Sequence, residues 1–236
     1  MPDLILSCNL IIVEHIFYIS FSMKFKERIT MLNIKPDQRF AAFIDGSNFH
    51  ASTKALQFDV DFEKLLQALR QSGHLVRAYY YTALPDNNEY SPIKRIADWL
   101  DYNGYTVVSK PWRDFTNSET GQRRIKGNMD MELALDMIKI ANHVEHVVLF
   151  SGDGDFCRLL HEVQDKGVSV TVISSHKLVA DTLRRQADDF IEINQIRHLI
   201  ERDAQSQNSQ ENDYDGHYDM NTDHSTSEAE VISRSS

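Results

Sequence analysis

The sequence predicts an α/β fold in which helices cover both faces of a mainly parallel central sheet of about five strands. Apolar runs typical of strands alternate with amphipathic runs typical of helices throughout residues 39–200. This alternation favours a doubly wound parallel sheet. In addition, residues 147–150 are four consecutive apolar residues, as expected for a strand that is buried on both faces. We therefore expect a single domain over residues 39–202.

The same patterns place each element in order. Strands are expected at residues 40–44, 75–84, 105–109, 147–150 and 168–173, with a short last strand at 190–193. Helices are expected at residues 60–70, 92–102, 129–142, 156–166, 178–186 and 195–202. Ser91 is expected to cap the second helix, with Pro92 in the first helical position. Asn128 and Asn194 are expected to cap the third helix and the last.

The two ends of the chain differ in composition from this domain. Residues 4–21 are apolar, but polar residues interrupt the run and no lysine or arginine precedes it. Neither a membrane anchor nor a secretory signal is therefore expected. We expect residues 1–38 to be an N-terminal extension, for which Met23 and Met31 are alternative starts. Residues 203–236 are polar and acidic with little apolar content, which is typical of a disordered tail.

Charge and cysteine content restrict the function classes. The formal net charge is -10, which by itself disfavours nucleic-acid binding. However, from residue 201 onward the tail holds about nine acidic residues and two arginines, so the domain itself is only mildly acidic. Cys8 and Cys157 are too few and too far apart for a disulfide framework or a zinc site. We therefore expect a reducing, cytoplasmic location.

Aspartates follow two of the expected strands at the point where each strand ends. Asp153 and Asp155 come just after the strand at residues 147–150, and Asp45 directly follows the strand at residues 40–44. A helix cap or an Asx-turn is a sufficient explanation for each motif alone. If the two strands are neighbours, however, the winding reverses between them, and the three carboxylates converge in the crevice at this switch point.

A fourth aspartate is expected at the same edge of the sheet. Asp130 lies in the first turn of a helix, where the helix dipole also favours an acid, and a right-handed crossover brings that turn to the same edge. Asp136 is about 240° further around this helix and cannot share its face. Carboxylates that converge raise one another's pKa unless a cation compensates them. Oxygen ligands favour Mg²⁺ or Mn²⁺, which can activate water for attack on a phosphodiester.

A basic stretch lies between the third expected strand and Asp130. Aromatic side chains interrupt a set of five basic residues, Lys110, Arg113, Arg123, Arg124 and Lys126. We interpret the stretch as a loop or hairpin beside the site. Basic and aromatic residues together suit a nucleic-acid backbone with exposed bases. A solvated charged loop is the alternative interpretation.

Three motifs carry a resemblance to a known family. They are FIDGSN at residues 43–48, KGNMD at residues 126–130 with LALDM at residues 133–137, and SGDGDF at residues 151–156. In this order and spacing the chain resembles the NYN domain over about residues 39–200. The branch it resembles is the LabA-like group of the PIN-like nuclease superfamily. It departs from the pattern at Asn128-Met129, where many members carry Gly or Val.

The resemblance implies a PIN-like, three-layer α/β/α fold and metal-dependent ribonuclease chemistry. By position it implies that the catalytic and metal-binding residues are Asp45, Asp130, Asp153 and Asp155. Asn48 and Ser151 would support these carboxylates, and Lys126 would lie near the phosphate. Asp136 also matches the family pattern, with a less defined role.

The leading hypothesis is therefore an endoribonuclease that uses Mg²⁺ or Mn²⁺ and acts on single-stranded or structured RNA. The alternative is a non-catalytic module of the same family that binds RNA or a protein. A third class, phosphatases of the haloacid-dehalogenase type, needs a second aspartate two residues after the first, and this chain has Ser47 there. No membrane partner is expected, and a homodimer is left open.

Overall fold

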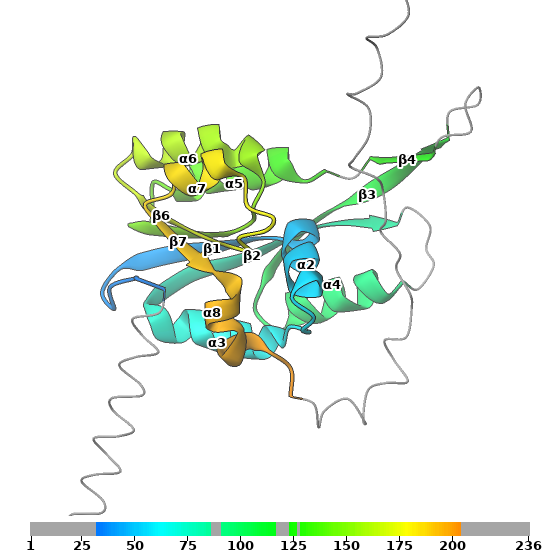
Figure 1. Ribbon diagram of the computed structural model, residues 1–236, viewed down its shortest axis with the longest axis horizontal. Coiled ribbons are helices and arrows are strands. Elements are labelled where there is room, and N and C mark those ends of the chain that lie inside the picture. The colour runs from blue at the N-terminus through cyan, green and yellow to red at the C-terminus, as the bar shows by residue number, and fades with distance from the viewer. Residues whose placement is uncertain (1–31, 86–90, 117–122, 127, 204–236) are drawn as a thin grey trace, which may run out of the picture. The chain divides into compact units, whose positions relative to one another are not determined.

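The computed structural model describes residues 32–85, 91–116, 123–126 and 128–203 (Figure 1). Within the ranges 113–116 and 123–126 it describes the backbone and not the side chains. The expectations for the N-terminal extension before residue 32 and for the acidic tail after residue 203 therefore lie outside the described residues.

The described strands form one seven-stranded sheet in the order β4-β3-β2-β1-β5-β6-β7. Six strands pair in parallel: β1 (Arg39–Asp45), β2 (His74–Pro85), β3 (Thr106–Thr116), β5 (His146–Phe150), β6 (Ser169–Ser174) and β7 (Asp189–Glu192). Strand β4 (Arg123–Lys126) pairs antiparallel with the end of β3. The mainly parallel sheet is confirmed. The strand expected at residues 190–193 is β7, which lies at one edge. The sheet exceeds the expected number of about five strands because, in addition, β3 continues into a hairpin with β4 at the opposite edge.

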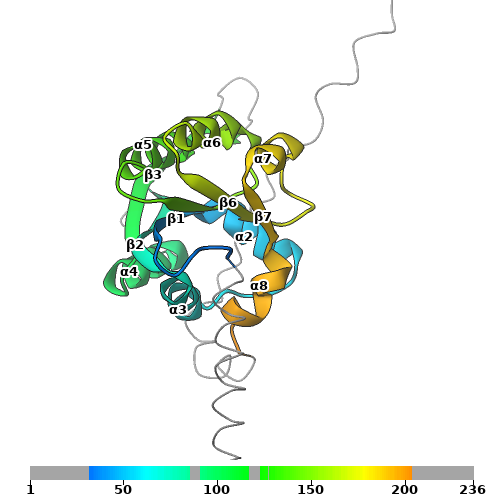
Figure 2. The same ribbon diagram turned by 90° about the vertical axis from the view of Figure 1, so that its left-hand side faces the viewer.

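Helices cover both faces of this sheet, which confirms the three-layer α/β/α architecture (Figure 2). One face carries α2 (Gly46–Ala55), α3 (Phe62–Ser72), α4 (Pro92–Tyr102) and α8 (Ile193–Ile200). The other face carries α5 (Asp130–Ile140), the 3₁₀ turn η1 (Gly154–Phe156), α6 (Cys157–Gln164) and α7 (Asp181–Gln186).

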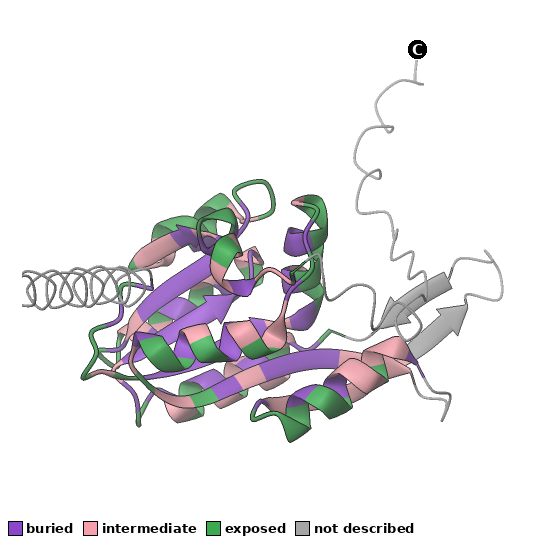
Figure 3. Ribbon diagram, turned by 90° about the horizontal axis from the view of Figure 1, so that it is seen from below, coloured by how far each residue is buried: buried purple, intermediate pink, exposed green. Residues whose placement is uncertain are grey.

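The alternation of side chains along the strands divides the apolar residues into two cores. On β1, Phe40, Ala42 and Ile44 belong to the core on the α3 side. Ala41 and Phe43 belong to the core on the α5 side, because successive strand residues point to opposite faces. All five are fully buried, and Figure 3 shows the same burial along the central strands. The continuous apolar runs in the sequence thus mark strands that are covered on both faces.

The ends of the helices confirm some of the expected caps and correct others. Ser91 caps α4 by accepting a hydrogen bond from the N–H of Lys94 at 3.3 Å. Asn128 is not the N-cap of α5; it lies one residue before the cap position, where its Oδ1 accepts from the N–H of Asp130 in an Asx-turn. Asn194 lies inside α8, which begins one residue earlier.

Helix α2 is absent from the sequence-based expectations. It begins at Gly46, directly after β1, and its N-cap is Asp45. The helix is hard to recognise because its residues are polar or small and only Phe49 is a large buried side chain. An apolar stripe of the kind that marks an amphipathic helix is therefore missing.

Strand β1 lies between β2 and β5, so the winding reverses there as the sequence predicts. The chain builds β2, β3 and β4 on one side of β1, returns through α5, and adds β5, β6 and β7 on the other side. In the β1–β5 register Ile44 pairs with Phe150. The residues that follow this pair, Asp45 and Ser151, therefore leave the sheet at the same level of its carboxyl edge.

Candidate metal centre

The turn from β1 into α2 holds Asp45 in a fixed position. A Cβ atom on Gly46 would lie 2.7 Å from the carbonyl oxygen of Tyr81 and 2.9 Å from the ring of Tyr80. Glycine therefore allows the helix to begin immediately at the end of the strand. Asp45 then caps α2, because its Oδ1 accepts from the N–H of Asn48 at 3.2 Å and from the hydroxyl of Ser47 at 2.8 Å.

Hydrogen bonds join this turn to the turn that follows β5. The hydroxyl of Ser151, which is 1% exposed, donates to Oδ2 of Asp45 at 3.0 Å. The same hydroxyl accepts from the N–H of Asp153 at 3.2 Å. Asn48 Oδ1 accepts from the N–H of Gly152 at 2.8 Å. Ser151 and Asn48 thus fix the two acidic turns relative to each other across the β1–β5 boundary.

Close packing also shapes the β5–η1 turn. A Cβ atom on Gly152 would lie 2.7 Å from the carbonyl oxygen of Leu178 and from the hydroxyl of Ser174. The turn therefore presses against the loop after β6. Beyond Gly152, Asp153 caps η1 by accepting from the N–H of Asp155 at 3.0 Å.

Asp130, Asp153 and Asp155 come together at this edge of the sheet. One carboxylate oxygen from each lies within 4.8 Å of the other two. Asp130 and Asp153 are half-buried, and Asp155 is exposed. Asp130 enters from the first turn of α5, where Asn128 holds it through the Asx-turn and a side-chain bond to Oδ2.

The electrostatics of the cluster favour a compensating positive charge. Burial raises the pKa of Asp130, and the negative charges of Asp153, Asp45 and Asp155 raise it further. The hydrogen bond from Asn128 opposes this rise. The donor set consists of carboxylate oxygens, and the exposure of Asp155 lets water reach it. These are the features that a small hard cation such as Mg²⁺ or Mn²⁺ requires.

Asp45 stands apart from the other three proposed ligands. It lies outside the group whose oxygens meet within 4.8 Å, and both of its own oxygens accept hydrogen bonds. Its negative charge nevertheless raises the pKa of Asp130. The structure therefore gathers three of the four aspartates directly and holds the fourth next to them through Ser151.

Asp136 does not join the cluster. Its Oδ2 accepts a hydrogen bond from the hydroxyl of Tyr81 at 3.1 Å, on the side of α5 that faces β2. Burial raises the pKa of Tyr81, and the charge of Asp136 and the hydrogen bond to it act in the same direction. This contact ties α5 to the sheet. Tyr80 lies in the core on the α3 side of the sheet and Tyr81 in the core on the α5 side.

The basic stretch is a hairpin, one of the two forms expected from the sequence. Residue Arg113 of β3 pairs with Lys126 of β4, and the pairing continues to Thr116 and Arg123. The side chains of Arg113, Arg123, Arg124 and Lys126 lie outside the described residues. The ammonium group of Lys110 is described, and it forms an ion pair with Glu132 of α5 at 3.0 Å. Its role as a phosphate ligand stays a prediction.

Sequence reasoning missed two contributors to the site. Ser47 donates to Asp45, and Asn128 binds the carboxylate of Asp130. The signal for the second was present, because an asparagine two residues before an acid at a helix start is typical of an Asx-turn. The signal for Ser47 was weak, because its role depends on a helix that the sequence did not predict.

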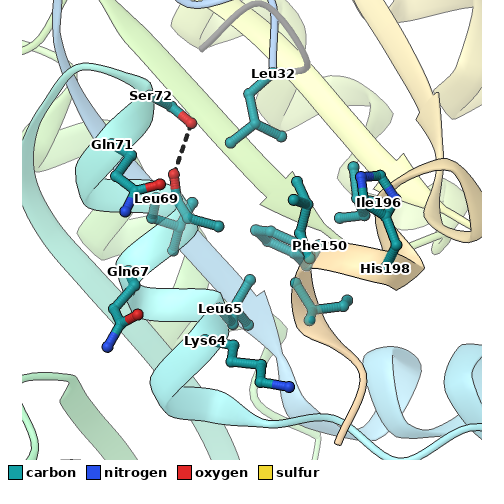
Figure 4. Close-up of a pocket in the computed structure, with 13 residues that line it drawn as sticks. Leu32, Lys64, Leu65, Gln67, Leu69, Gln71, Ser72, Phe150, Ile196 and His198 are labelled. Carbon is teal, nitrogen blue, oxygen red and sulfur yellow. Dashed lines mark hydrogen bonds between the residues drawn. The ribbon is translucent and has the colours of Figure 1, made fainter. Parts of the chain in front are cut away.

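A cavity lies away from this edge, between α3 and α8. It has a volume of about 250 Å³. Both apolar side chains, such as Leu65 and Phe150, and polar ones, such as Gln67 and His198, line it (Figure 4). None of the clustered aspartates lines it. In the part of the chain that the structure describes, no helix is long and apolar enough to cross a membrane.

Comparison with known proteins identifies the family. The model of the NYN domain matches residues 39–194. The chain is 37% identical over 168 residues to the low amplitude and bright protein LabA of Synechococcus elongatus, which covers 70% of this chain and 88% of that protein. A crystal structure of a Vibrio parahaemolyticus protein of unknown function aligns with a TM-score of 0.55 and 27% identity, over 66% of this chain and 93% of that one. The chain therefore belongs to the NYN domain family and is LabA-like.

Proposed function

We propose that this protein is an endoribonuclease that hydrolyses RNA phosphodiester bonds with Mg²⁺ or Mn²⁺. The observation that carries the proposal is the meeting of Asp130, Asp153 and Asp155 within 4.8 Å at the switch point of the sheet. Ligands of open α/β sheets bind at this point. Membership of the NYN family supports a nucleic-acid substrate.

Each residue of the cluster has a proposed role. Asp130, Asp153 and Asp155 would hold the cation, which when bound lowers the pKa of a water ligand and offsets charge on the phosphodiester. Asp45 would complete the acidic set and accept the proton of the attacking water on Oδ2, which accepts one hydrogen bond from the described residues, that of Ser151. Asn48 and Ser151 keep the turns in register, which fixes the carboxylates before substrate binds.

The basic hairpin supports an RNA substrate. Strand β4 ends at Lys126, four residues before Asp130, so the hairpin leads directly into the acidic cluster. We propose that Arg113, Arg123, Arg124 and Lys126, together with Lys110, bind phosphates on either side of the cleaved bond. We further propose that the catalytic domain spans residues 39–202 and that the protein works in the cytoplasm.

One observation favours a second function, a non-catalytic module that binds RNA or a protein. Both oxygens of Asp45 accept hydrogen bonds, from Ser47, Asn48 and Ser151. A carboxylate held in this way can serve to stabilise two turns without taking part in a reaction. In that case the cluster would bind a cation and stabilise the fold without turnover.

Cleavage and metal binding measured together distinguish the two functions. Wild type should cut single-stranded or hairpin RNA in Mn²⁺ and lose this activity in EDTA. Asp153→Asn should remove both the cleavage and the stabilisation by Mn²⁺. Asp98→Asn is the matched control, because Asp98 is an exposed acid on α4 outside the cluster, and it should behave as wild type.

Two other outcomes would argue against the endoribonuclease proposal. If Mn²⁺ raises the melting temperature of wild type but no RNA is cut, the non-catalytic module is supported. If Asp153→Asn cuts RNA as fast as wild type, the proposed site is wrong.

A further inference from the structure

Helix α5 carries three exposed apolar side chains on the side that faces away from the sheet. Met131 is 68% exposed, Leu135 61% and Ile138 37%. Their spacing of four and three residues is that of a single helix face. The opposite face of α5, which includes Leu133 and Met137, is buried in the core. Single exposed apolar residues are ordinary on protein surfaces, but these three lie on successive turns and form a continuous stripe.

Among the residues that the structure describes, the stripe is open to solvent. Helix α5 contacts β1 on its inner side and α6 along its flank. In Figure 2 it lies at one end of the row formed by α7, α6 and α5. As far as the described residues are concerned, its outer face is therefore available to a partner without any rearrangement.

The charges beside the stripe are arranged for pairing with a second copy of the same helix. Glu132 and Lys139 lie seven residues apart, so both lie on the same flank of α5. In an antiparallel pair of α5 helices, Glu132 of each copy is level with Lys139 of the other. Two opposite-charge pairs then form about one two-fold axis, as in an isologous interface. Glu132 keeps its contact with Lys110, because a carboxylate can accept from two cations.

The same alignment also fits the apolar residues together. The two-fold axis falls midway between positions 132 and 139, next to Leu135. With a rise of about 1.5 Å per residue, Leu135 of the two copies meets at the axis. Met131 of each copy then lies beyond Ile138 of the other, so the side chains alternate along the interface and none is opposed by a charge.

We propose that this chain forms a symmetric dimer through antiparallel packing of the outer faces of α5. The interface would be smaller than the roughly 800 Å² per partner of a standard complex, so we expect a dissociation constant in the micromolar range. The proposal does not depend on the nuclease function, because its readout is the state of association.

Sedimentation equilibrium of the full chain over a wide micromolar range tests the proposal. Wild type should pass from a 27.3 kDa monomer to a dimer. Leu135→Lys should raise the dissociation constant about tenfold or more, because two charges would be buried at the axis. Tyr102→Lys is the matched control, since Tyr102 is a 91% exposed residue of α4, and it should leave the dissociation constant unchanged.

A charge exchange tests the antiparallel geometry. Lys139→Glu alone should weaken the dimer about two- to fivefold, because each glutamate would face Glu132 of the other copy. Adding Glu132→Lys should restore association by reversing both pairs. The proposal is overturned if wild type stays monomeric, if Leu135→Lys leaves a dimer intact, or if Tyr102→Lys weakens it equally. A monomeric wild type in which Leu135→Lys lowers the melting temperature would show that another part of the chain covers the stripe.

Discussion

Replacing Asp130 with asparagine should make the metal-free protein more stable and the metal-loaded protein less stable. The side chain keeps its shape, and the bond from the N–H of residue 130 to Asn128 remains. What the change removes is a negative charge that lies within 4.8 Å of Asp153 and Asp155. The sign of its effect therefore depends on whether a cation is bound.

The size of the effect follows from the separation of the charges. At 4.8 Å, the upper limit of the separation between these oxygens, two unit charges repel by about 0.9 kcal/mol in bulk water and by about 3.5 kcal/mol at an effective dielectric constant near 20. Asp130 is half-buried and Asp155 is exposed. Solvent screening therefore brings the repulsion between Asp130 and its two neighbours closer to the lower value. The substitution also removes the charge-assisted hydrogen bond from Asn128 to Asp130, which offsets part of the stability gained by removing the repulsion. We expect a net stabilisation of about 1 kcal/mol, or about 2–4 °C in melting temperature.

Thermal unfolding in EDTA and in a Mn²⁺ series measures both states. Wild type should gain about 2.7 kcal/mol at a Mn²⁺ concentration one hundred times the dissociation constant, whereas Asp130→Asn should gain little. The order of the two melting temperatures should therefore reverse as Mn²⁺ is added. Asp98→Asn serves again as the control. Equal stabilisation of both proteins by Mn²⁺, or a variant that is less stable in EDTA, would refute the reasoning.

The pH dependence of the metal-free protein provides an independent check. The pKa of Asp130 is raised in the folded state, so between the ordinary and the raised pKa the folded state binds more protons than the unfolded state. Stability should then fall as pH rises through the raised pKa. Asp130→Asn should lack this contribution. If the stability of wild type and of the variant in EDTA changed with pH in the same way, the prediction would be contradicted.

Two further predictions concern the scaffold. Tyr81→Phe removes the 3.1 Å bond to Asp136 and should cost about 1 kcal/mol in urea unfolding; a double-mutant cycle with Asp136→Asn should show coupling, and additive effects would argue against the contact. His146 is 2% exposed and bonded to Thr171 at 2.8 Å, and burial lowers its pKa. The unfolded state therefore takes up the proton first as pH falls below about 6.5, and stability should drop by up to about 1.4 kcal/mol per pH unit until the lowered pKa is reached. His146→Gln should flatten this part of the profile, and an unchanged slope would show that another group is responsible.

Much of the fold could be predicted because the signals are local. The apolar run at residues 147–150 marks a strand that is covered on both faces, and Ser91 with Pro92 marks the start of α4. Helix α2 could not be predicted in the same way, since its one large buried side chain, Phe49, gives no periodicity. The antiparallel β4 was only one of two forms that a basic stretch could take, because pairing with β3 is decided by the partner strand.

The candidate site, like the fold, could be predicted from the sequence only in part. The sequence shows that Asp45, Asp130 and Asp153 end strands or begin helices, and the handedness of crossovers brings such ends to one edge. It does not show which oxygens meet. Asp45 was expected to bind the metal together with the other aspartates. In the structure its oxygens accept hydrogen bonds from Ser47, Asn48 and Ser151.

The sequence by itself therefore determined the layer architecture, the order of the elements other than α2 and β4, and the edge at which the acids gather. Only the tertiary structure decided the arrangement within that edge. Ser151 and Asp45 are 106 residues apart in the chain, and they meet because the β1–β5 register pairs Ile44 with Phe150. A register depends on how two whole strands pack between helices, whereas propensity and periodicity report only on a residue's own neighbours along the chain.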